Sequence, residues 1–334
     1  MQSPHAAAAS VVAVDESTAG QRLDNFLAKV LKGVPRSHIY RIVRSGEVRV
    51  NGARAAASHK LAGADMVRIP PIRVAERDVA SAPARTYPVI FEDDWLLAIN
   101  KPAGVAVHGG SGVSWGVIES LRAARDDRFL ELVHRLDRDT SGVLLLARKR
   151  SALTALHASL RAREADKRYF ALAAGVWKGD GVTVDTPLYK YLTASGERRV
   201  RVASAAEGQA ARSQFRPLRR FAFERPVDGA DGLTLLEARI HTGRTHQIRV
   251  HLQSLGHPVL GDDKYGLDAL NARIARGDAV TGLARNPRMF LHAARLALNH
   301  PHTGAPLVFE AGWPDADAAW LRQLGQLCGP GRGG

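Results

Sequence analysis

The stretch "LVHRLDRDTSGVLLLA", residues 132–147, places charged side chains directly beside an apolar run. Two arginines and two aspartates, Arg135, Asp137, Arg138 and Asp139, stand within five residues, and a run typical of a buried strand follows at once. A carboxylate at the edge of a core is costly unless a cation pairs with it. The segment therefore predicts a charged loop that is held at the mouth of the core for a chemical purpose.

A second stretch, "HTGRTHQIRVH" at 241–251, offers the cation that such a carboxylate needs. It supplies Arg244 and Arg249 beside the start of an expected helix. An arginine within ion-pairing range would keep an aspartate such as Asp137 charged, and a charged carboxylate can act as nucleophile or base. A structural ion pair accounts for the same spacing equally well, so the residues by themselves leave both alternatives open.

Other catalytic and binding motifs are absent or incomplete. "DTSG" at 139–142 is similar to an aspartic-protease loop, but that chemistry needs a second such carboxylate, and the sequence offers none. The "TSG" of this stretch is not a G-x-S-x-G elbow, and the chain lacks a phosphate loop and a G-x-G-x-x-G unit that follows a strand. Four histidines lack the spacing of a metal site and better suit core, capping or RNA-contacting roles: His241, His246, His251 and His257. We expect no metal.

The composition indicates a globular protein, long enough for two domains, with an excess of positive charge. The 334 residues carry 47 Lys and Arg against 33 Asp and Glu, a net charge of +14. Such a field favours a polyanionic partner. The single cysteine, Cys328, excludes a disulfide framework within one chain and a cysteine-based zinc site. The sequence shows no signal peptide and no apolar run of membrane-spanning length, so we expect a cytoplasmic protein without a membrane partner.

The positive charge is concentrated in residues 20–77, which hold twelve lysines and arginines against four acids. Apolar positions at helical spacing predict two helices there, and "EVRVNG" and "MVRIP" predict two short strands. The second helix is expected to bury Ile39, Ile42 and Val43. Its other positions carry Arg36, His38, Arg41 and Arg44. A face of one sign is typical of a phosphate-contacting surface, so we expect a small α/β RNA-binding module.

Five segments are predicted along the chain. They are a disordered tail (1–17), the RNA-binding module (18–77), a linker (78–87), a larger domain (88–322) and a C-terminal tail (323–334). Strands and helices mix in the larger domain without a regular βαβ repeat, which predicts an α+β fold with a mixed, largely antiparallel sheet.

Six stretches stand in order across residues 88–300: "NKPAGVAVHGG", "HRLDRDTSGVLLLA", "KRYFAL", "TGRTHQIRVH", "GHPVLGDDKYG" and "LHA". In these stretches the chain resembles the ribosomal large subunit pseudouridine synthases, which isomerise uridine to pseudouridine in RNA. Residues 22–52 resemble the small RNA-binding module first named in a ribosomal small-subunit protein. That module, together with "RIPPIRVAER" and "VHGGSG", is similar to the subtype that modifies several uridines of large-subunit ribosomal RNA. Loops such as 191–232 diverge from the pattern and concern only fine RNA specificity.

The resemblance implies roles for individual residues. Asp137 corresponds to the family's essential aspartate, and Arg244 to the arginine that pairs with it. Arg135 corresponds to the arginine that inserts where the target uridine leaves the stack. Tyr169 corresponds to the aromatic residue that stacks on the flipped base, and Leu291 to an apolar residue that lines the pocket. The expected contacts to RNA or the pocket are completed by Arg36, Arg41, Arg44 and His108.

The implied reaction breaks and re-forms the glycosidic bond without net hydrolysis, redox change or energy input, so the resemblance implies an isomerase without a cofactor. The expected partner is 23S ribosomal RNA or the assembling large ribosomal subunit, and the expected state is a monomer. Two alternatives are a transfer-RNA pseudouridine synthase and a non-catalytic rRNA-binding ribosome assembly factor. The basic module argues against the first, and the aspartate at position 137 argues against the second.

Overall fold

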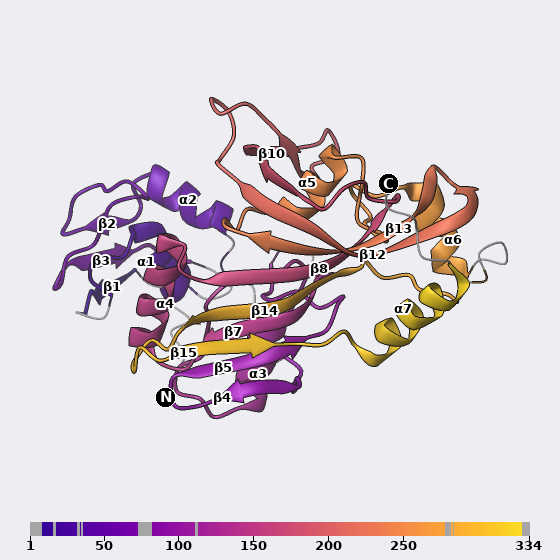
Figure 1. Ribbon diagram of the computed structural model, residues 1–334. Helices are drawn as coiled ribbons and strands as arrows, with labels where there is room; N and C mark the ends of the chain where they lie inside the picture. Colours follow the sequence, from indigo (N-terminus) through magenta and orange to yellow (C-terminus); the bar gives the residue numbers. More distant parts are fainter. Residues whose placement is uncertain are drawn as a thin grey trace. The chain divides into compact units, whose positions relative to one another are not determined.

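The computed structural model describes residues 9–15, 18–31, 34, 36–72, 82–110, 113–277, 282 and 284–328. The chain divides into two compact units, residues 1–81 and 82–334. Figure 1 traces their helices and strands along the sequence. No helix within the described residues has the length and apolar character that a membrane crossing requires.

The first unit is a small α/β module around one apolar core. Its strands β1 (Ser10–Ala13), β2 (Arg49–Val50) and β3 (Met66–Ile69) form an antiparallel sheet with β3 in the centre. The core combines apolar side chains from these strands with those of α1 (Leu23–Val30) and α2 (Arg36–Arg44). The two predicted helices and two predicted strands are therefore confirmed.

The prediction of a disordered tail through residue 17 is wrong for Ser10–Ala13. These four residues form β1 and pair with β3, from Ser10 opposite Ile69 to Ala13 opposite Met66. Valines favour strands because their branched side chains pack well on a pleated surface, and Val14 just after the strand is buried. The alanine-rich composition of this segment concealed a short β pattern. Residues 1–8 lie outside the described part of the chain.

The second unit is built on a ten-stranded sheet. Its main path runs β4-β5-β7-β14-β8-β13-β12-β9, while β15 pairs with β14 and β6 with β7. The strands are β4 (Val89–Glu92), β5 (Leu96–Lys101), β6 (Glu131–Leu132), β7 (Ser141–Ala147), β8 (Asp166–Ala174), β9 (Val182–Asp185), β12 (Arg212–Val227), β13 (Ala230–Ile240), β14 (Leu291–Asn299) and β15 (Pro306–Glu310). Only β14 and β7 pair in parallel among the described strands, which confirms the predicted α+β fold. In Figure 1 the strands β5, β7, β14 and β8 lie side by side.

Helices cover both faces of this sheet, and this explains the continuous apolar run of β7. Leu144 and Leu146 belong to the core that includes α3 (Val117–Ala124) and α5 (Gln247–Ser254), whereas Val143 and Leu145 belong to the core that includes α4 (Arg150–Ala162). A strand buried on both faces has no alternation of apolar and polar residues. The predicted buried strand is confirmed, and it provides a rigid support for the loop before it.

The parallel pairing of β7 with β14 brings two distant motifs together. His292 lies opposite Ser141, and Ala293 lies opposite Gly142. The backbone of Gly142 has a φ of +109°, and a Cβ atom there would lie 2.2 Å from the carbonyl oxygen of Ala293. Only glycine fits such a position. As a result, Leu291 in the "LHA" motif begins its strand beside the charged loop.

Two segments predicted to lack regular structure contain it. The region 191–232 includes β12 and most of a two-stranded hairpin, β10 (Leu188–Leu192) and β11 (Arg198–Val202). The predicted tail from residue 323 begins inside α7 (Asp315–Leu327), where Leu324 packs into a core cluster shared with α6 (Asp268–Arg276). In both segments apolar residues that tertiary contacts bury were not evident from composition. Residues 78–81 of the predicted linker and residues 329–334 lie outside the described part.

Candidate active site

Asp137 lies in the loop between β6 and β7. The Thr140 N–H donates to the backbone carbonyl of Asp137 at 3.2 Å and so closes a turn around it. The Asp137 side chain remains 30% exposed. Arg138 and Asp139, the next two residues of the loop, pair with each other at 3.2 Å near the surface. The carboxylate of Asp137 is therefore the one that faces the interior of the site.

A buried lysine anchors this loop. The ammonium group of Lys101, at the end of β5, donates to the backbone carbonyls of Arg138 (3.0 Å), Pro102 (2.8 Å) and Val105 (2.8 Å). Lys101 is fully buried. Burial lowers its pKa to about 7, although the charges of Asp139 and Asp137 oppose that shift. The lysine thus connects the end of β5 to the loop.

The arginine that pairs with Asp137 is Arg249, not Arg244 as predicted. Arg249 Nη1 lies 3.4 Å from Asp137 Oδ2, and its side chain is only 4% exposed. Arg249 is in the first turn of α5, which points it inward, whereas Arg244 precedes the helix. The Nε of Arg244 donates to the Ala210 carbonyl at 3.0 Å. Arg244 and Arg249 both belong to the motif predicted to supply the cation, but it is Arg249, on the helix, whose side chain reaches Asp137.

Three carboxylates surround the guanidinium of Arg249. Asp262, which is fully buried, accepts from its Nε and Nη2 at 2.6 Å each. Asp263 accepts from Nη2 at 3.1 Å. Burial disfavours the arginine's charge, yet hydrogen bonding to Asp262 and the neighbouring negative charges outweigh it and raise the pKa of Arg249. This network fixes the cation before any substrate is present.

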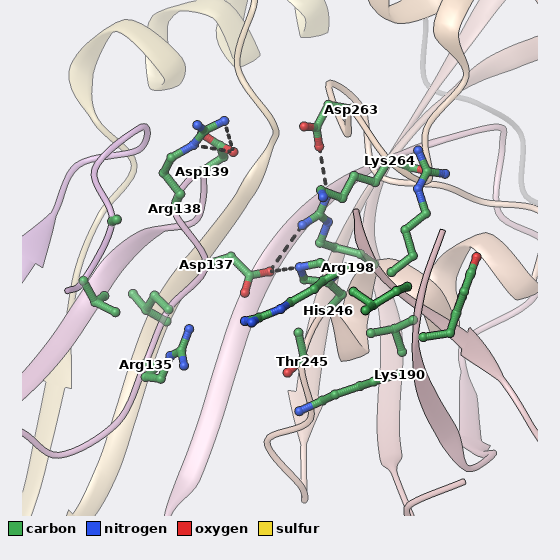
Figure 2. A pocket seen from close by; sticks show the side chains of 18 of the residues that line it. Arg135, Asp137, Arg138, Asp139, Lys190, Arg198, Thr245, His246, Asp263 and Lys264 are labelled. Carbon is green, nitrogen blue, oxygen red and sulfur yellow. Dashed lines mark hydrogen bonds and ion pairs between the residues drawn. The ribbon is translucent and has the colours of Figure 1, made fainter. Parts of the chain in front are cut away.

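His246 approaches the same oxygen of Asp137. Its Nε2 lies 4.0 Å from Oδ2, and Figure 2 shows His246 beside Asp137 with a dashed line for this contact. The contacts of Arg249 and His246 both reach Oδ2, and the described residues make no such contact with Oδ1. Oδ2 of Asp137 is thus the oxygen that protein groups approach.

A small cavity unites the residues to which the family resemblance assigned roles. Its volume is about 90 Å³. The residues that line it include Arg135, Asp137, Tyr169, Arg244 and Leu291. These residues lie in the loop before β7, in β8, in the turn before α5 and in β14. The tertiary structure therefore brings these five residues together, and their individual roles stay predictions.

Tyr169 forms the inner wall of this cavity. It lies on β8, where its Cα is opposite Ala238 of β13 and Ala293 of β14. Burial raises its pKa, and the charge of Asp137 adds to that shift. The side chain is 8% exposed. A protonated phenol ring held between small residues can offer a flat face to a base.

A larger cavity of about 940 Å³ opens beside the small one and shares Arg135, Asp137, His246 and Arg249 with it. The β10–β11 hairpin forms one wall, which includes Tyr189, Lys190, Tyr191 and Arg198. His108 also lines this cavity. Figure 2 shows Lys190 and Arg198 extending from the hairpin toward the side where Asp137 and Arg135 lie. The site therefore has a compact chemical centre and a wide basic, aromatic entrance.

The basic surface predicted in the first unit lies on α2. Arg41 and Arg44 are exposed, and Arg41 contacts His38 at 3.1 Å and Glu47 at 4.0 Å. The side chain of Arg36 lies outside the described part of the chain. The described side chains agree with an exposed basic face, and RNA contact by this face stays a prediction.

Several parts of the site were missed by sequence reasoning. Lys101 and Asp262 belong to the family motifs but received no role, and His246 was expected only in a core, capping or RNA-contacting role, because a motif does not show which side chains turn inward. The hairpin was missed for a different reason. In its first strand Lys190 stands between two tyrosines, and in its second strand Val200 stands between two arginines. This alternation is a β pattern that was present in the sequence.

Comparison with solved structures defines the fold. The human protein RNA Pseudouridylate Synthase Domain Containing 1 superposes with a TM-score of 0.56 at 23% identity, over 73% of this chain and 89% of its own. The human RNA Pseudouridylate Synthase Domain Containing 4 gives a TM-score of 0.54 at 25% identity, over 71% of this chain and 92% of its own. The second unit thus has the fold of RNA pseudouridylate synthases.

Sequence comparison is more specific. The family model described as RNA pseudouridylate synthase matches residues 95–254, and that of the S4 domain matches 21–67. Ribosomal large subunit pseudouridine synthase C of Yersinia pestis is 50% identical over 90% of this chain and 91% of its own length. The protein of the same name from Escherichia coli strain K12 is 49% identical over 94% and 96%. The chain belongs to the RNA pseudouridylate synthase family, as its motifs indicated, and carries an S4 domain in its first unit.

Proposed function

We propose that this pseudouridine synthase isomerises several uridines of large-subunit (23S) ribosomal RNA and that Asp137 acts on the uridine. The observation that carries the proposal is the position of the Asp137 carboxylate. Arg249 engages Oδ2, while Arg135, Tyr169, Arg244 and Leu291 line the same small cavity as this carboxylate. The names of the relatives support ribosomal RNA as the substrate.

The reaction breaks the bond between N1 of uracil and C1′ of the sugar, rotates the base, and joins C5 to C1′. The C5 proton is lost and N1 gains one, so no net reagent is consumed. Either attack on C1′ or removal of the 2′ proton needs an ionised carboxylate oxygen within reach of the sugar. The pairing of Oδ2 with Arg249 balances that charge and leaves Oδ1 to react.

The uridine must leave the stack first, which costs a few kcal/mol. Arg135 is exposed at the entrance, where its flat cation can occupy the vacated space. Tyr169 then stacks on the flipped base, a contact worth roughly 1–3 kcal/mol. Leu291 closes the apolar side of the cavity.

The S4 domain and the net charge of +14 support binding to a large, folded RNA. Arg41 and Arg44 on α2 are proposed to contact phosphates, and Arg36 is proposed with them from its position in the sequence. We further propose that the enzyme works as a cytoplasmic monomer on 23S RNA or the assembling large subunit.

The decisive variant is Asp137→Asn, which keeps the shape of the side chain and removes its charge. We expect it to abolish pseudouridine formation in 23S RNA while RNA binding, measured by filter retention, stays unchanged. The matched control is Asp139→Asn, because Asp139 pairs with Arg138 near the surface and should keep most of its turnover.

Two results would contradict the proposal. Turnover by Asp137→Asn would remove the aspartate from the chemistry. Modification of transfer RNA in preference to 23S RNA by the wild-type protein would show that the substrate assignment is wrong.

A further inference from the structure

The hydroxyl group of Tyr265 connects the β10–β11 hairpin to the ring of His246. The backbone N–H of Val200, in β11, donates to Tyr265 Oη at 2.9 Å. The same oxygen lies 2.8 Å from His246 Nδ1. On the opposite side of the ring, Nε2 lies 4.0 Å from Asp137 Oδ2. These contacts form a chain from β11 to the proposed catalytic carboxylate.

The donors in this chain determine where the imidazole proton lies. A backbone N–H can only donate, so Tyr265 Oη accepts from Val200 and keeps its own hydrogen for another partner. Among the contacts of the described residues, only His246 Nδ1 can accept that hydrogen. A proton on Nδ1 would leave the hydroxyl hydrogen of a buried tyrosine unpaired, which is unfavourable. The neutral ring therefore carries its proton on Nε2, the nitrogen that faces Asp137.

The surroundings support these protonation states. Burial is the largest cause that lowers the pKa of His246, so the ring is neutral at physiological pH. The charged groups around it are Asp137 and Asp262, which raise its pKa, and Arg249 and Lys264, which lower it. Burial raises the pKa of Tyr265 to about 12, so its hydroxyl can donate.

One loop holds both groups that approach Asp137 Oδ2. The carboxylate of Asp262 binds Arg249 and also accepts the backbone N–H groups of Lys264 at 2.9 Å and Tyr265 at 3.0 Å. The Arg249 guanidinium stacks on the Tyr265 ring, with 5.1 Å between the guanidinium carbon and the ring centre. The buried carboxylate of Asp262 thus fixes the positions of both Arg249 and Tyr265, the tyrosine that orients His246.

We propose that His246 is a positioning residue for Asp137, a neutral imidazole whose Nε2–H is aimed by the Tyr265 hydroxyl at Oδ2 so that Oδ1 stays directed at the uridine. This inference rests on the proposed function of Asp137. The 4.0 Å separation is longer than a hydrogen bond, and catalytic hydrogen bonds commonly shorten only when the substrate is bound.

Two substitutions of His246 separate this role from a structural one. Its backbone is left-handed, with a φ of +53°, which asparagine tolerates. His246→Asn can keep an amide near Tyr265 but cannot reach Asp137, whereas His246→Gln places an N–H donor near the position of Nε2. We expect kcat to fall roughly tenfold in His246→Asn, with KM and the thermal unfolding temperature unchanged. His246→Gln, if equally stable, should recover most of the loss.

Tyr265→Phe provides an independent readout. Without the donated hydrogen bond, the neutral ring is less favoured, so the pKa of His246 should rise. A protonated ring would place a second cation against Asp137 Oδ2 and make the carboxylate a weaker nucleophile or base, so the acid limb of the kcat profile should then move to higher pH by roughly one unit. In a His246→Asn background this shift should vanish, because the two residues act as one unit.

The proposal is overturned if His246→Asn keeps wild-type kcat, if the asparagine and glutamine variants are equally impaired while stable, or if the acid limb does not move in Tyr265→Phe. Failure of the function itself is distinguishable, because it would appear as turnover by Asp137→Asn.

Discussion

At the scale of single residues, the two arginines of "TGRTHQIR" make different contacts and are expected to have different roles. Arg249 is buried among Asp137, Asp262 and Asp263. Arg244 contacts a backbone carbonyl and lines the small cavity. Removing one partner of a buried ion pair leaves the other charge uncompensated, which is far more costly than removing a partly exposed side chain.

We therefore predict different outcomes for a matched pair of variants. Arg249→Met should lower the free energy of unfolding by about 3–5 kcal/mol and abolish turnover, because it leaves the buried carboxylate of Asp262 without its cation. Arg244→Met should change the free energy of unfolding by less than about 0.5 kcal/mol, and it should reduce turnover because Arg244 borders the cavity. Urea unfolding and single-turnover assays would measure both effects. Equal stability of the two variants would show that the Asp262 contact contributes little.

At the scale of elements, the charged loop owes its position to the ends of β5 and β7. β7 is buried on both faces and cannot shift without disturbing two cores. Lys101 at the end of β5 satisfies three backbone carbonyls, one of which belongs to Arg138 in the loop. The strands thus determine where Asp137 lies, although neither strand contains it.

Lys101→Met tests this connection. Methionine fills a similar volume but leaves three backbone carbonyls without their buried donor, and each unsatisfied carbonyl costs about 1–3 kcal/mol. We expect a loss of several kcal/mol in the free energy of unfolding. Under conditions where the variant is folded, kcat should fall more than KM rises, because the loop is misplaced while the RNA surface is intact. Unchanged kcat in folded protein would show that the loop holds its shape without the lysine.

At the scale of the whole molecule, the net charge of +14 suits a ligand that is a dense polyanion. The charge is uneven: residues 20–77 hold twelve lysines and arginines against four acids. The S4 domain match at 21–67 falls in the same segment. We therefore expect the first unit to contribute affinity for RNA, while the proposed chemistry on uridine belongs to the second unit.

This division predicts a specific salt effect. In the double variant Arg41→Gln/Arg44→Gln, affinity for 23S RNA should fall, and the slope of log K against log salt should become shallower by about 0.7–0.9 for each phosphate that the variant no longer neutralises. Turnover at saturating RNA should be unchanged, because the active site is in the other unit. The matched control is Arg219→Gln on β12, outside the module. An unchanged slope in the double variant would place the RNA-binding surface elsewhere.

The sequence alone determined the family, the α+β class, the two helices and two of the three strands of the module, and the buried strand β7, and it predicted a catalytic role for Asp137. These features depend on local patterns: helical spacing, β alternation and contiguous motifs. Composition misled where a short pattern was hidden, as in Ser10–Ala13 and in the hairpin within 188–202.

Only the tertiary structure decided that Arg249 rather than Arg244 meets Asp137. It also showed that Lys101 anchors the loop. Asp262 holds Arg249 in place, and Tyr265 orients His246. Each of these contacts joins residues from segments distant in sequence, or depends on the direction in which a helix turns its side chains. Sequence spacing reports which residues are present, whereas the packing of α5 against the sheet determines which of them face the same cavity.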